Sequence, residues 1–432
     1  MERYNEYKDS GVQWLGDIPS HWVDCKLRRL SKIVRGGSPR PIEDYLSDEG
    51  YNWIKIGDTI KGSKYITSTK QKIKKSGLSA TRFVHSGDLI LTNSMSFGNP
   101  YILDIDGCIH DGWLAFSELN GIDKEYLYYV LVSDLCGKQF KLQVDGGVVQ
   151  NLNIDKVKDT WLALPPIEEQ SSMVAYLDTA TAKIDETIAQ QQKMIDLLNE
   201  RKQIIINKAV TKGLNPDVPM KDSGVDWIGE ICKNWRMYRL KHLLKTNLMY
   251  GANESAESEE TSYPRYIRIT DIDENGKLKP DTFRSLEPLK AEPYLLTRGD
   301  ILFARSGATA GKTYLFDEDI KACFAGYLIK AQVSNKLLPR YLMYYTRSGI
   351  YDQWKNSIFI QATIQNIGAD KYANLSIPLP TIEEQKTIVS YLDTETMKID
   401  KVLDTHKRQI SLLQERKQII INDVVTGKVK VL

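Results

Sequence analysis

The sequence predicts an α+β protein in which two mixed α/β modules alternate with two long helices. Three observations lead to this prediction. The chain of 432 residues, 42% hydrophobic and 26% charged, is too long for a single core but ordinary in composition for a globular protein. Blocks of the first half return in the second half, and each half ends in a stretch with the apolar spacing of a coiled-coil helix. We therefore divide the chain into residues 1–164, 165–213, 214–379 and 380–432, in the order module, helix, module, helix.

The repeat itself is plain in three pairs of blocks. "KDSGVQWLGDIPSHW" returns as "KDSGVDWIGEICKNW", "LPPIEEQSSMVAYLDTATAKIDETI" returns as "LPTIEEQKTIVSYLDTETMKIDKVL", and "ERKQIIIN" returns unchanged; the paired ranges are 8–22 and 221–235, 164–188 and 379–403, 200–207 and 415–422. The sequence between these blocks differs much more. We therefore expect one scaffold that carries two different modules.

Each module, 30–162 and 240–377, is expected to mix strands with shorter helices. Apolar runs broken by Gly, Asn and Asp predict strands at 53–58, 88–92, 266–272, 300–304 and 327–333. The stretches "KEYLYYVLVSDL" and "PRYLMYYTRSGI", at 124–135 and 339–350, predict helices.

Apolar residues at alternating steps of three and four predict the two long helices and the seam between them. The predicted seam consists of Leu177, Ile184, Ile188, Gln191, Ile195 and Leu198 in the first helix and Leu392, Ile399, Leu403, His406, Ile410 and Leu413 in the second. Pro166 and Pro380 precede the helices, and Gly213 and Gly427 offer stops. The stretch 167–207 alone would span about 60 Å. The alternative is that each helix lies only on its own module.

The polar seam residues Gln191 and His406 occupy equivalent positions near the middle of the helices. A polar residue in a coiled-coil seam commonly fixes register at some cost in stability. We expect this role for the pair and no catalytic role for His406.

Motifs that would indicate an enzyme are incomplete. "ARSGATAGKT" (304–313) resembles a phosphate-binding loop, but Ser306 stands where the first glycine is required, and the matching stretch of the first half has no lysine. "DIDENG" (271–276) lacks the twelfth-position glutamate of a calcium loop and predicts a hairpin turn. "NPY" (99–101) lacks one proline of a methyltransferase turn, and no glycine-rich cofactor loop follows a first strand. We expect no catalytic constellation and no metal site.

Composition and termini point to a cytoplasmic protein. The five cysteines lie far apart without zinc or disulfide spacing, as in reduced cytosolic proteins. The N-terminus has no apolar signal core, and no stretch reaches the ~20 apolar residues of a membrane helix.

Local charge, rather than the formal net charge of +2, indicates nucleic-acid binding. Between Thr59 and Gly87 there are seven Lys or Arg and no acid, beside the basic run 26–40. A solvated lysine-rich face is the alternative to phosphate contact. The residues that we predict to contact DNA are Arg35, Gly36, Ser38, Arg40, Lys55, Lys70, Lys72, Lys74, Asn93, Ser94, Ser96 and Asn99 in the first module and Arg268, Arg305, Ser306, Thr309, Lys312 and Gln361 in the second.

Over essentially its whole length the chain resembles the specificity subunit of type I restriction-modification systems. The residues that carry the resemblance are the two copies of "LP.IEEQ…YLDT…KID…ERKQIIIN", the paired "DSGV.W" segments, and the module landmarks "GGSPRP", "WIKIGD", "GDLIL", "GDILF" and two "QN" turns.

The resemblance implies a non-catalytic subunit with two target-recognition domains in a pseudo-twofold arrangement, joined by two helices that form an antiparallel coiled coil. Each domain would read one half of a split target in double-stranded DNA. Two methyltransferase subunits and the restriction (motor) subunits would be its partners, and S-adenosylmethionine, ATP and Mg²⁺ would bind those partners rather than this chain. A coiled-coil adaptor without DNA readout and a nucleotide-hydrolysing enzyme remain the alternatives.

Overall fold

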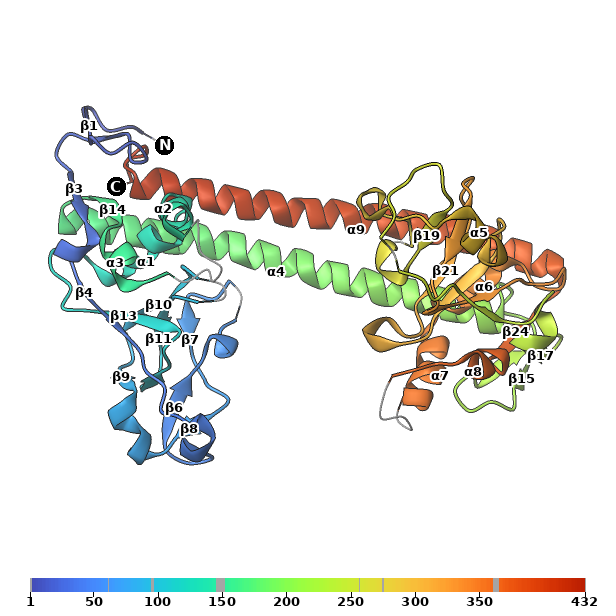
Figure 1. The fold of residues 1–432 in the computed structure, drawn as a ribbon. Helices are drawn as coiled ribbons and strands as arrows, with labels where there is room; N and C mark the ends of the chain where they lie inside the picture. Colours follow the sequence, from blue (N-terminus) through green and yellow to red (C-terminus); the bar gives the residue numbers. More distant parts are fainter. Residues whose placement is uncertain are drawn as a thin grey trace. The chain divides into compact units, whose positions relative to one another are not determined.

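The computed structural model describes residues 2–60, 62–94, 97–144, 152–255, 257–273, 276–359 and 365–431. The chain forms two compact units, residues 1–192 with 407–432, and residues 193–406. The helices α4 (Ile167–Lys212) and α9 (Ile382–Val425) each contribute to both units (Figure 1). The unit boundaries therefore fall inside the long helices and not at the ends of the modules.

The module of the first unit is built on two five-stranded sheets. One has the strand order β4-β13-β10-β11-β7 and the other β5-β8-β6-β12-β9. Their strands are β4 (Lys32–Arg35), β5 (Leu46–Ser47), β6 (Tyr51–Ile54), β7 (Tyr65–Ile66), β8 (Lys72–Ile73), β9 (Arg82–Val84), β10 (Leu89–Thr92), β11 (Pro100–Leu103), β12 (Gly107–Ile109) and β13 (Trp113–Ser117). Strand β12 runs parallel to β6, which places the end of the "WIKIGD" strand beside the turn that follows β12.

The module of the second unit repeats part of this plan. Its main sheet has the order β18-β23-β20-β21, and β19 pairs in parallel with β22 as β6 does with β12. The strands are β18 (Met249–Tyr250), β19 (Arg265–Ile267), β20 (Ile301–Ala304), β21 (Thr313–Leu315), β22 (Ala322–Phe324) and β23 (Leu328–Ala331). The predicted strands 53–58 and 266–272 are shorter than expected, because each turns into a 3₁₀ helix (Ile56–Asp58, Ile269–Asp271) held by an aspartate.

Short two-stranded ribbons connect the modules to the long helices. The first unit has β1 (Tyr7–Asp9) with β2 (Asp17–Pro19) and β3 (Val23–Lys26) with β14 (Trp161–Leu164); the second has β15 (Met220–Asp222) with β16 (Glu230–Cys232) and β17 (Arg236–Arg239) with β24 (Ser376–Leu379). The β1–β2 and β15–β16 ribbons lie largely within one pair of repeated blocks, and the other two ribbons directly adjoin repeated blocks, so the scaffold has the same local structure in both halves.

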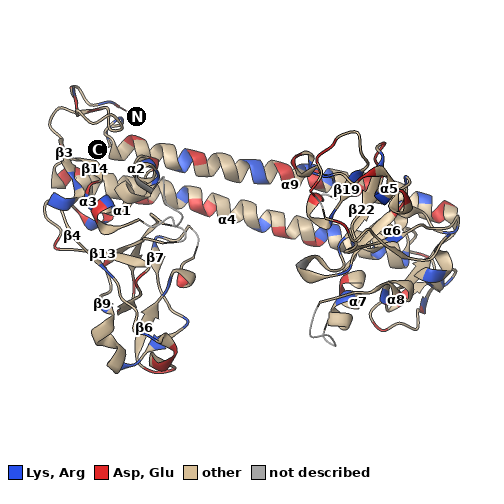
Figure 2. Ribbon diagram, viewed as in Figure 1, with Lys and Arg blue, Asp and Glu red and all other residues tan. Residues whose placement is uncertain are grey.

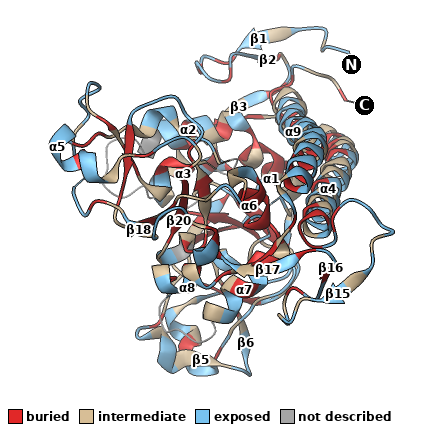
Figure 3. Cartoon of the chain, turned by 90° about the vertical axis from the view of Figure 1, so that its right-hand side faces the viewer, coloured by how far each residue is buried: buried red, intermediate tan, exposed pale blue. Residues whose placement is uncertain are grey.

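Each predicted short helix is interrupted at a serine. The first unit has α1 (Lys124–Val132), α2 (Asp134–Val144) and α3 (Ile154–Lys158); the second has α5 (Pro288–Ala291), α6 (Pro339–Tyr345), α7 (Gly349–Phe359) and α8 (Ala369–Ala373). The hydroxyl of Ser133 donates to the Val130 carbonyl and accepts from the Cys136 N–H, which starts a new helix; Ser348 does the same with Tyr345 and Tyr351. Helices α1 and α6 are largely buried (Figure 3).

Within each unit the long helices pack against each other in opposite directions. In the first unit the start of α4 lies near the end of α9, because Trp22 donates to Glu169 and also packs on Gly427, and further along Lys417 pairs with Asp185 (2.6 Å). In the second unit the equivalent pair is Lys202 with Asp400 (2.6 Å). The antiparallel pairing is therefore present in both units.

The predicted seam residues are all buried or half-buried. Leu177, Ile184, Ile195, Leu392, Ile399 and Leu403 are buried, and Ile188, Gln191, Leu198, His406, Ile410 and Leu413 are half-buried. Acidic and basic residues are both distributed along the two helices (Figure 2). The register role of Gln191 and His406 stays a prediction.

Both helices end at the expected glycines, which have positive φ (68° at Gly213, 71° at Gly427). The chain returns to its start in the first unit, where Glu2 bridges Lys430 and the Tyr7 hydroxyl donates to the Gly427 carbonyl (3.0 Å). None of the helices in the described part of the chain combines the length and apolar character that crossing a bilayer requires.

Candidate nucleic-acid interface

A buried glutamine ties the start of each long helix to its module. Gln170, from the repeated "IEEQ" block, is fully buried, and its Oε1 accepts a hydrogen bond from the Asp123 N–H (2.7 Å). Its Nε2 donates to the carbonyls of Gly121 (3.1 Å) and Pro165 (2.9 Å). Both Nε2 hydrogens and the Oε1 atom bond to backbone groups, so the side chain fixes the loop before α1 against the start of α4.

Gln385 makes the same three bonds in the second unit. Its Oε1 accepts from the Leu338 N–H (2.8 Å), and its Nε2 donates to the carbonyls of Lys336 (2.9 Å) and Pro380 (3.1 Å). The glutamine therefore makes the same set of hydrogen bonds at the joint between module and helix in both halves.

Two tyrosines of α1 strengthen this joint. The hydroxyl of the fully buried Tyr126 donates to the Ala163 carbonyl at the end of the module (3.0 Å). The Tyr129 hydroxyl donates to Asp178 on α4 (2.5 Å), and burial followed by this bond raises the pKa of Tyr129. In the second unit the hydroxyl of Tyr344 donates to Asp393 (2.6 Å), and burial followed by that bond raises its pKa to about 12. Both phenols remain neutral donors at physiological pH.

The ion pairs at the joint differ between the halves. In the first unit Lys64 pairs with both Glu125 and Asp178, and only 14% of its side chain is exposed. Burial alone would lower the pKa of Lys64, but its bonds to the two carboxylates outweigh this effect and raise it. In the second unit Arg340 pairs with Asp393 (2.8 Å). Lys64 lies in the basic segment between Thr59 and Gly87. Its ammonium group is nevertheless paired with two carboxylates of the protein, so it does not belong to a phosphate-binding face.

Four of the predicted DNA-contacting residues of the first module meet at one aspartate. The Asp111 carbonyl accepts from Arg35 Nε (2.7 Å) and from Asn93 Nδ2 (3.1 Å). The Asp111 carboxylate accepts from the Ser38 hydroxyl (2.9 Å) and lies 3.7 Å from the Arg40 guanidinium, whose side chain is 84% exposed. Asp111 was not predicted from the sequence. It lies in the turn between β12 and β13, and its chemistry becomes visible only when the surrounding residues converge on it.

The charge of Asp111 is secured by its surroundings. Burial alone would raise the pKa of Asp111, but the hydrogen bond from Ser38 and the nearby basic side chains outweigh it and hold that pKa below its ordinary value. A charged carboxylate among donors can accept a hydrogen bond from an exocyclic base amine. Asn93 is 4% exposed, and its Oδ1 has no partner in the described part of the chain.

The remaining predicted residues of the first module lie on its second sheet or in loops. Lys55 Nζ donates to Gln71 Oε1 (2.6 Å), and Asp58 accepts from the N–H groups of Lys55 and Lys70 (2.9 and 3.3 Å). Gly36 allows two backbone segments to approach closely, because a Cβ at this position would lie 2.2 Å from the His110 carbonyl oxygen.

Exposure separates the other predicted positions. Lys70, Lys72, Lys74 and Asn99 are exposed, and Ser94 is half-buried. The ammonium of Lys74 donates to the Asp44 carbonyl (2.8 Å) and leaves its remaining donors available. Ser96 lies outside the described residues.

In the second module the equivalent region centres on an arginine and two tyrosines. The guanidinium carbon of Arg305 lies 5.0 Å from the ring centroid of Tyr250, and the Arg305 N–H donates to the Tyr327 carbonyl (3.0 Å). Tyr327 is 67% exposed and Tyr250 is 40% exposed. These tyrosines were not predicted from the sequence, although the repeat could have found Tyr250, which occupies the position of Arg35.

The loop after β20 holds three further predicted residues. Ser306 bridges to Asn366, and the Thr309 hydroxyl donates to the Ser306 carbonyl (3.4 Å). Lys312 Nζ donates to the Ile272 carbonyl (3.2 Å). Gln361 lies outside the described residues.

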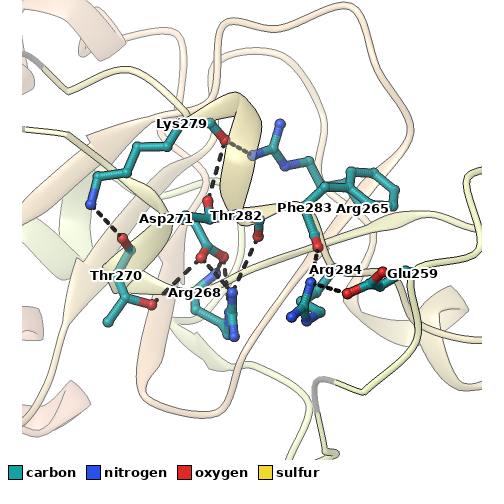
Figure 4. Close-up of polar contacts among 9 residues, drawn as sticks. All are labelled: Glu259, Arg265, Arg268, Thr270, Asp271, Lys279, Thr282, Phe283 and Arg284. Atoms are coloured by element: carbon teal, nitrogen blue, oxygen red, sulfur yellow. Dashed lines mark hydrogen bonds and ion pairs between the residues drawn. The ribbon is translucent and has the colours of Figure 1, made fainter. Parts of the chain in front are cut away.

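Arg268 is held inside the module (Figure 4). Its guanidinium donates twice to Asp271, whose side chain is 1% exposed, and once to the Thr282 carbonyl (3.2 Å). Arg265 is used in a similar way, donating to the Lys279 carbonyl (2.7 Å). The residues on either side of the predicted hairpin turn form an antiparallel bridge, Ile272 with Leu278, whereas residues 274 and 275 of "DIDENG" lie outside the described residues. The Arg268 guanidinium therefore has a structural role, because it holds Asp271 and the Thr282 carbonyl together.

The stretch 304–313 does not have the backbone geometry of a phosphate-binding loop. Such a loop turns its amide groups toward the phosphates. Here the amides of Gly307, Ala310, Gly311 and Lys312 all donate to backbone carbonyls of the protein. These four amides are therefore not available to bind a phosphate, which agrees with the incomplete sequence motif.

The two modules present different side chains at equivalent backbone positions. The carbonyls of Asn93 and Arg305 accept from the N–H groups of Leu152 and Ile367 (2.9 and 2.7 Å), and those of Asn99 and Lys312 accept from Thr92 and Ala304 (3.0 and 2.8 Å). The equivalent pairs are Arg35 and Tyr250, Asn93 and Arg305, Asn99 and Lys312, Asp111 and Gly326, and Gly112 and Tyr327. One backbone frame thus carries two different sets of donors and acceptors.

Comparison with known proteins decides the family. The family model described as the type I restriction modification DNA specificity domain matches residues 19–196 and again residues 232–417. The chain belongs to this family. It is 24% identical to the MjaVIII specificity subunit of Methanocaldococcus jannaschii, over 96% of this chain and 94% of that protein, and 23% identical to the EcoBI specificity subunit of Escherichia coli, over 89% and 81%.

The fold of the chain also matches that of a solved structure. That structure comes from work on complex assembly and conformational transition of the type I restriction-modification system. The TM-score is 0.70 at 19% identity, covering 95% of this chain and 99% of the other. The fold class predicted from the sequence, α+β with two modules and two long packed helices, is therefore confirmed.

Proposed function

We propose that this chain is the DNA-recognition subunit of a type I restriction-modification enzyme and that each module reads one half of a bipartite, asymmetric target. The observation that carries the proposal is the common backbone frame with exchanged side chains. Arg, Asn and Lys side chains are those that read base edges in the major groove. One backbone frame that carries such groups at different positions in the two modules would give two different half-sites.

Several further features belong to this proposal. The shared helices and ribbons would bind two methyltransferase subunits and receive the restriction subunits, and the chain itself would be non-catalytic. S-adenosylmethionine, ATP and Mg²⁺ would bind to those partner subunits and not to this chain, and the complex would work in the cytoplasm. Within the described part of the chain, no three His, Cys, Asp or Glu side chains gather as metal ligands would. Nothing favours an adaptor without DNA readout or a nucleotide-hydrolysing enzyme.

The proposed DNA contacts fall into two kinds. We propose that the exposed Lys70, Lys72 and Lys74 contact phosphates, which would position the protein without reading sequence. The side chains around Asp111 and those around Arg305 are proposed to read bases.

Methylation mapping in cells that express the chain with its methyltransferase tests the proposal. Arg305→Asn with Lys312→Asn gives the second module the residues of the first at two equivalent positions. We expect one half-site of the methylated motif to change while the other half-site and the spacer stay the same. A change in both half-sites, or methylation that does not depend on this chain, would contradict the division of labour.

A further inference from the structure

The second module contains a basic cavity lined by hydroxyl groups. The cavity has a volume of about 330 Å³ and lies where the loop after β20 meets the end of α6 and the helix α7. Its cations are Lys312, Arg347 and Lys355, and its hydroxyls are those of Thr309, Thr313 and Thr346. None of its lining residues that the structure describes carries a carboxylate. We refer to it as the threonine pocket.

The charge of the threonine pocket is only partly neutralised. Lys355 pairs with Asp352 (2.7 Å), whose side chain is 54% exposed, and Lys312 donates to a carbonyl. The exposed Arg347 has no acceptor for its guanidinium among the residues that the structure describes. Asp352 is the one carboxylate that pairs with a cation of the pocket, and Arg347 also lines a neighbouring cavity with Asp317 and Glu318. With three cations and no carboxylate in its own lining, the pocket itself still attracts an anion.

The pocket is held in shape by several contacts. Gly311 has a φ of 86°, and a Cβ there would lie 2.2 Å from Cδ of Lys355, so the lysine stem crosses the loop at its glycine. The buried Tyr351 hydroxyl donates to the Gly311 carbonyl (2.9 Å). The hydroxyls of Thr313 and Thr346 lie 2.9 Å apart. Little ordering would be needed when an anion enters.

The first module has an apolar cluster at the same position. The register is fixed by Ser133 and Ser348, which make the same two hydrogen bonds in both modules. A Cβ on Gly98 would meet Phe140, just as one on Gly311 would meet Lys355. The equivalent pairs are Phe140 and Lys355, Val132 and Arg347, Leu131 and Thr346, Pro100 and Thr313, and Asn99 and Lys312.

This replacement is not explained by stability. Phe140 and Leu131 are buried and fill the site, whereas their counterparts Lys355 and Thr346 leave a polar cavity. Exchanging buried apolar side chains for polar ones lowers stability unless the polar groups gain partners. Thr346 donates to the Met343 carbonyl (3.0 Å) and Lys355 pairs with Asp352, but the Arg347 guanidinium has no acceptor among the described residues. The partner that this guanidinium lacks is an anion with several acceptor oxygens, which can also take bonds from the ammonium groups and the hydroxyls.

We propose that the threonine pocket binds one phosphate group, and that this phosphate belongs to the backbone of the DNA bound by the second module. The source of the phosphate rests on the proposed function, because a free nucleotide or inorganic phosphate offers the same chemistry. A phosphate seated here would fix the loop that carries Arg305 and Lys312 relative to the duplex, while the first module has no counterpart.

The test measures duplex DNA binding by the full chain, assembled with its methyltransferase, across a salt series. The variant Arg347→Gln with Lys355→Gln removes two charges from the pocket, and Lys290→Gln with Lys398→Gln removes two exposed charges elsewhere in the same unit. A second pocket variant, Arg347→Val with Lys355→Phe, installs the residues of the first module and guards against a folding defect. In parallel, inorganic phosphate and ATP are added at constant ionic strength, and the melting temperature is recorded.

Loss of one phosphate contact lowers the salt slope by about 0.9, which corresponds to about an 8-fold weaker affinity at 0.1 M salt. We expect both pocket variants to show this loss for every sequence, the control variant to keep the wild-type slope, and phosphate or ATP to leave all melting temperatures alike. Unchanged slopes in both pocket variants, with wild-type binding intact, would overturn the pocket and leave the proposed function standing. If the wild type does not bind DNA but phosphate or ATP stabilises it and not the pocket variants, the pocket takes a free phosphate and the proposed function fails. If the wild type binds neither DNA nor phosphate or ATP, the phosphate pocket and the proposed function are both refuted.

Discussion

The buried Gln170 gives a quantitative test of how the module is fastened to its helix. Gln170→Leu keeps the volume of the side chain but removes all three hydrogen bonds to Asp123, Gly121 and Pro165. The Gly121 carbonyl belongs to an exposed residue and regains water, whereas Pro165 is buried and Asp123 is half-buried. One buried and one half-buried backbone group therefore lose their partner, at about 1–3 kcal/mol each, and the leucine returns some apolar burial.

We expect a loss of about 2–4 kcal/mol in the free energy of unfolding of the first unit. For a cooperative unit of roughly 200 residues this lowers the melting temperature by about 10 °C. Differential scanning calorimetry of the full chain measures it. Gln385→Leu breaks the same three bonds in the second unit and should give a similar shift, because the two joints have the same geometry. The exposed Gln190→Leu is the matched control and should change stability by no more than ~0.5 kcal/mol.

Melting temperatures of Gln170→Leu and Gln385→Leu within about 1 °C of the wild type would refute this reasoning. They would mean that water replaces the amide without cost, and that the repeated glutamines have a role other than fastening the joint.

Three further outcomes can be measured. Burial raises the pKa of the Cys25 and Cys108 thiols to about 11, so at pH 8 their thiolate fraction should be roughly 100-fold below that of a free thiol, and a thiol reagent should react with them only after unfolding. Replacing Lys70, Lys72, Lys74 and Lys75 together with Gln should weaken DNA binding for all sequences and flatten its salt dependence; an unchanged slope would place these lysines away from DNA. Four residues inserted after Ile195, about one helical turn, should alter the spacer of the methylated motif and leave both half-sites alone, whereas changed half-sites with an unchanged spacer would refute the role of the helices as a ruler.

The sequence alone determined the repeat, the two long helices and the glycines at their ends, because each rests on local rules. Helix period, capping and chain reversal depend on residues within a few positions of one another. The same local signals placed the strands, but they could not show that Ser133 and Ser348 divide the short helices, since serine also occurs inside helices.

Only the tertiary structure decided which basic residues are available to a ligand. Lys64 and Arg268 each count as one positive charge in the sequence. In the structure Lys64 pairs with two carboxylates at the joint between module and helix, and Arg268 pairs with a buried aspartate. Asp111 and the threonine pocket were invisible in the sequence, because their members lie apart along the chain and acquire a common function only where β-turn, loop and helix ends converge. Composition and spacing report what a segment can form by itself, whereas pairing of charges and the shape of a cavity depend on contacts between distant segments, which folding alone supplies.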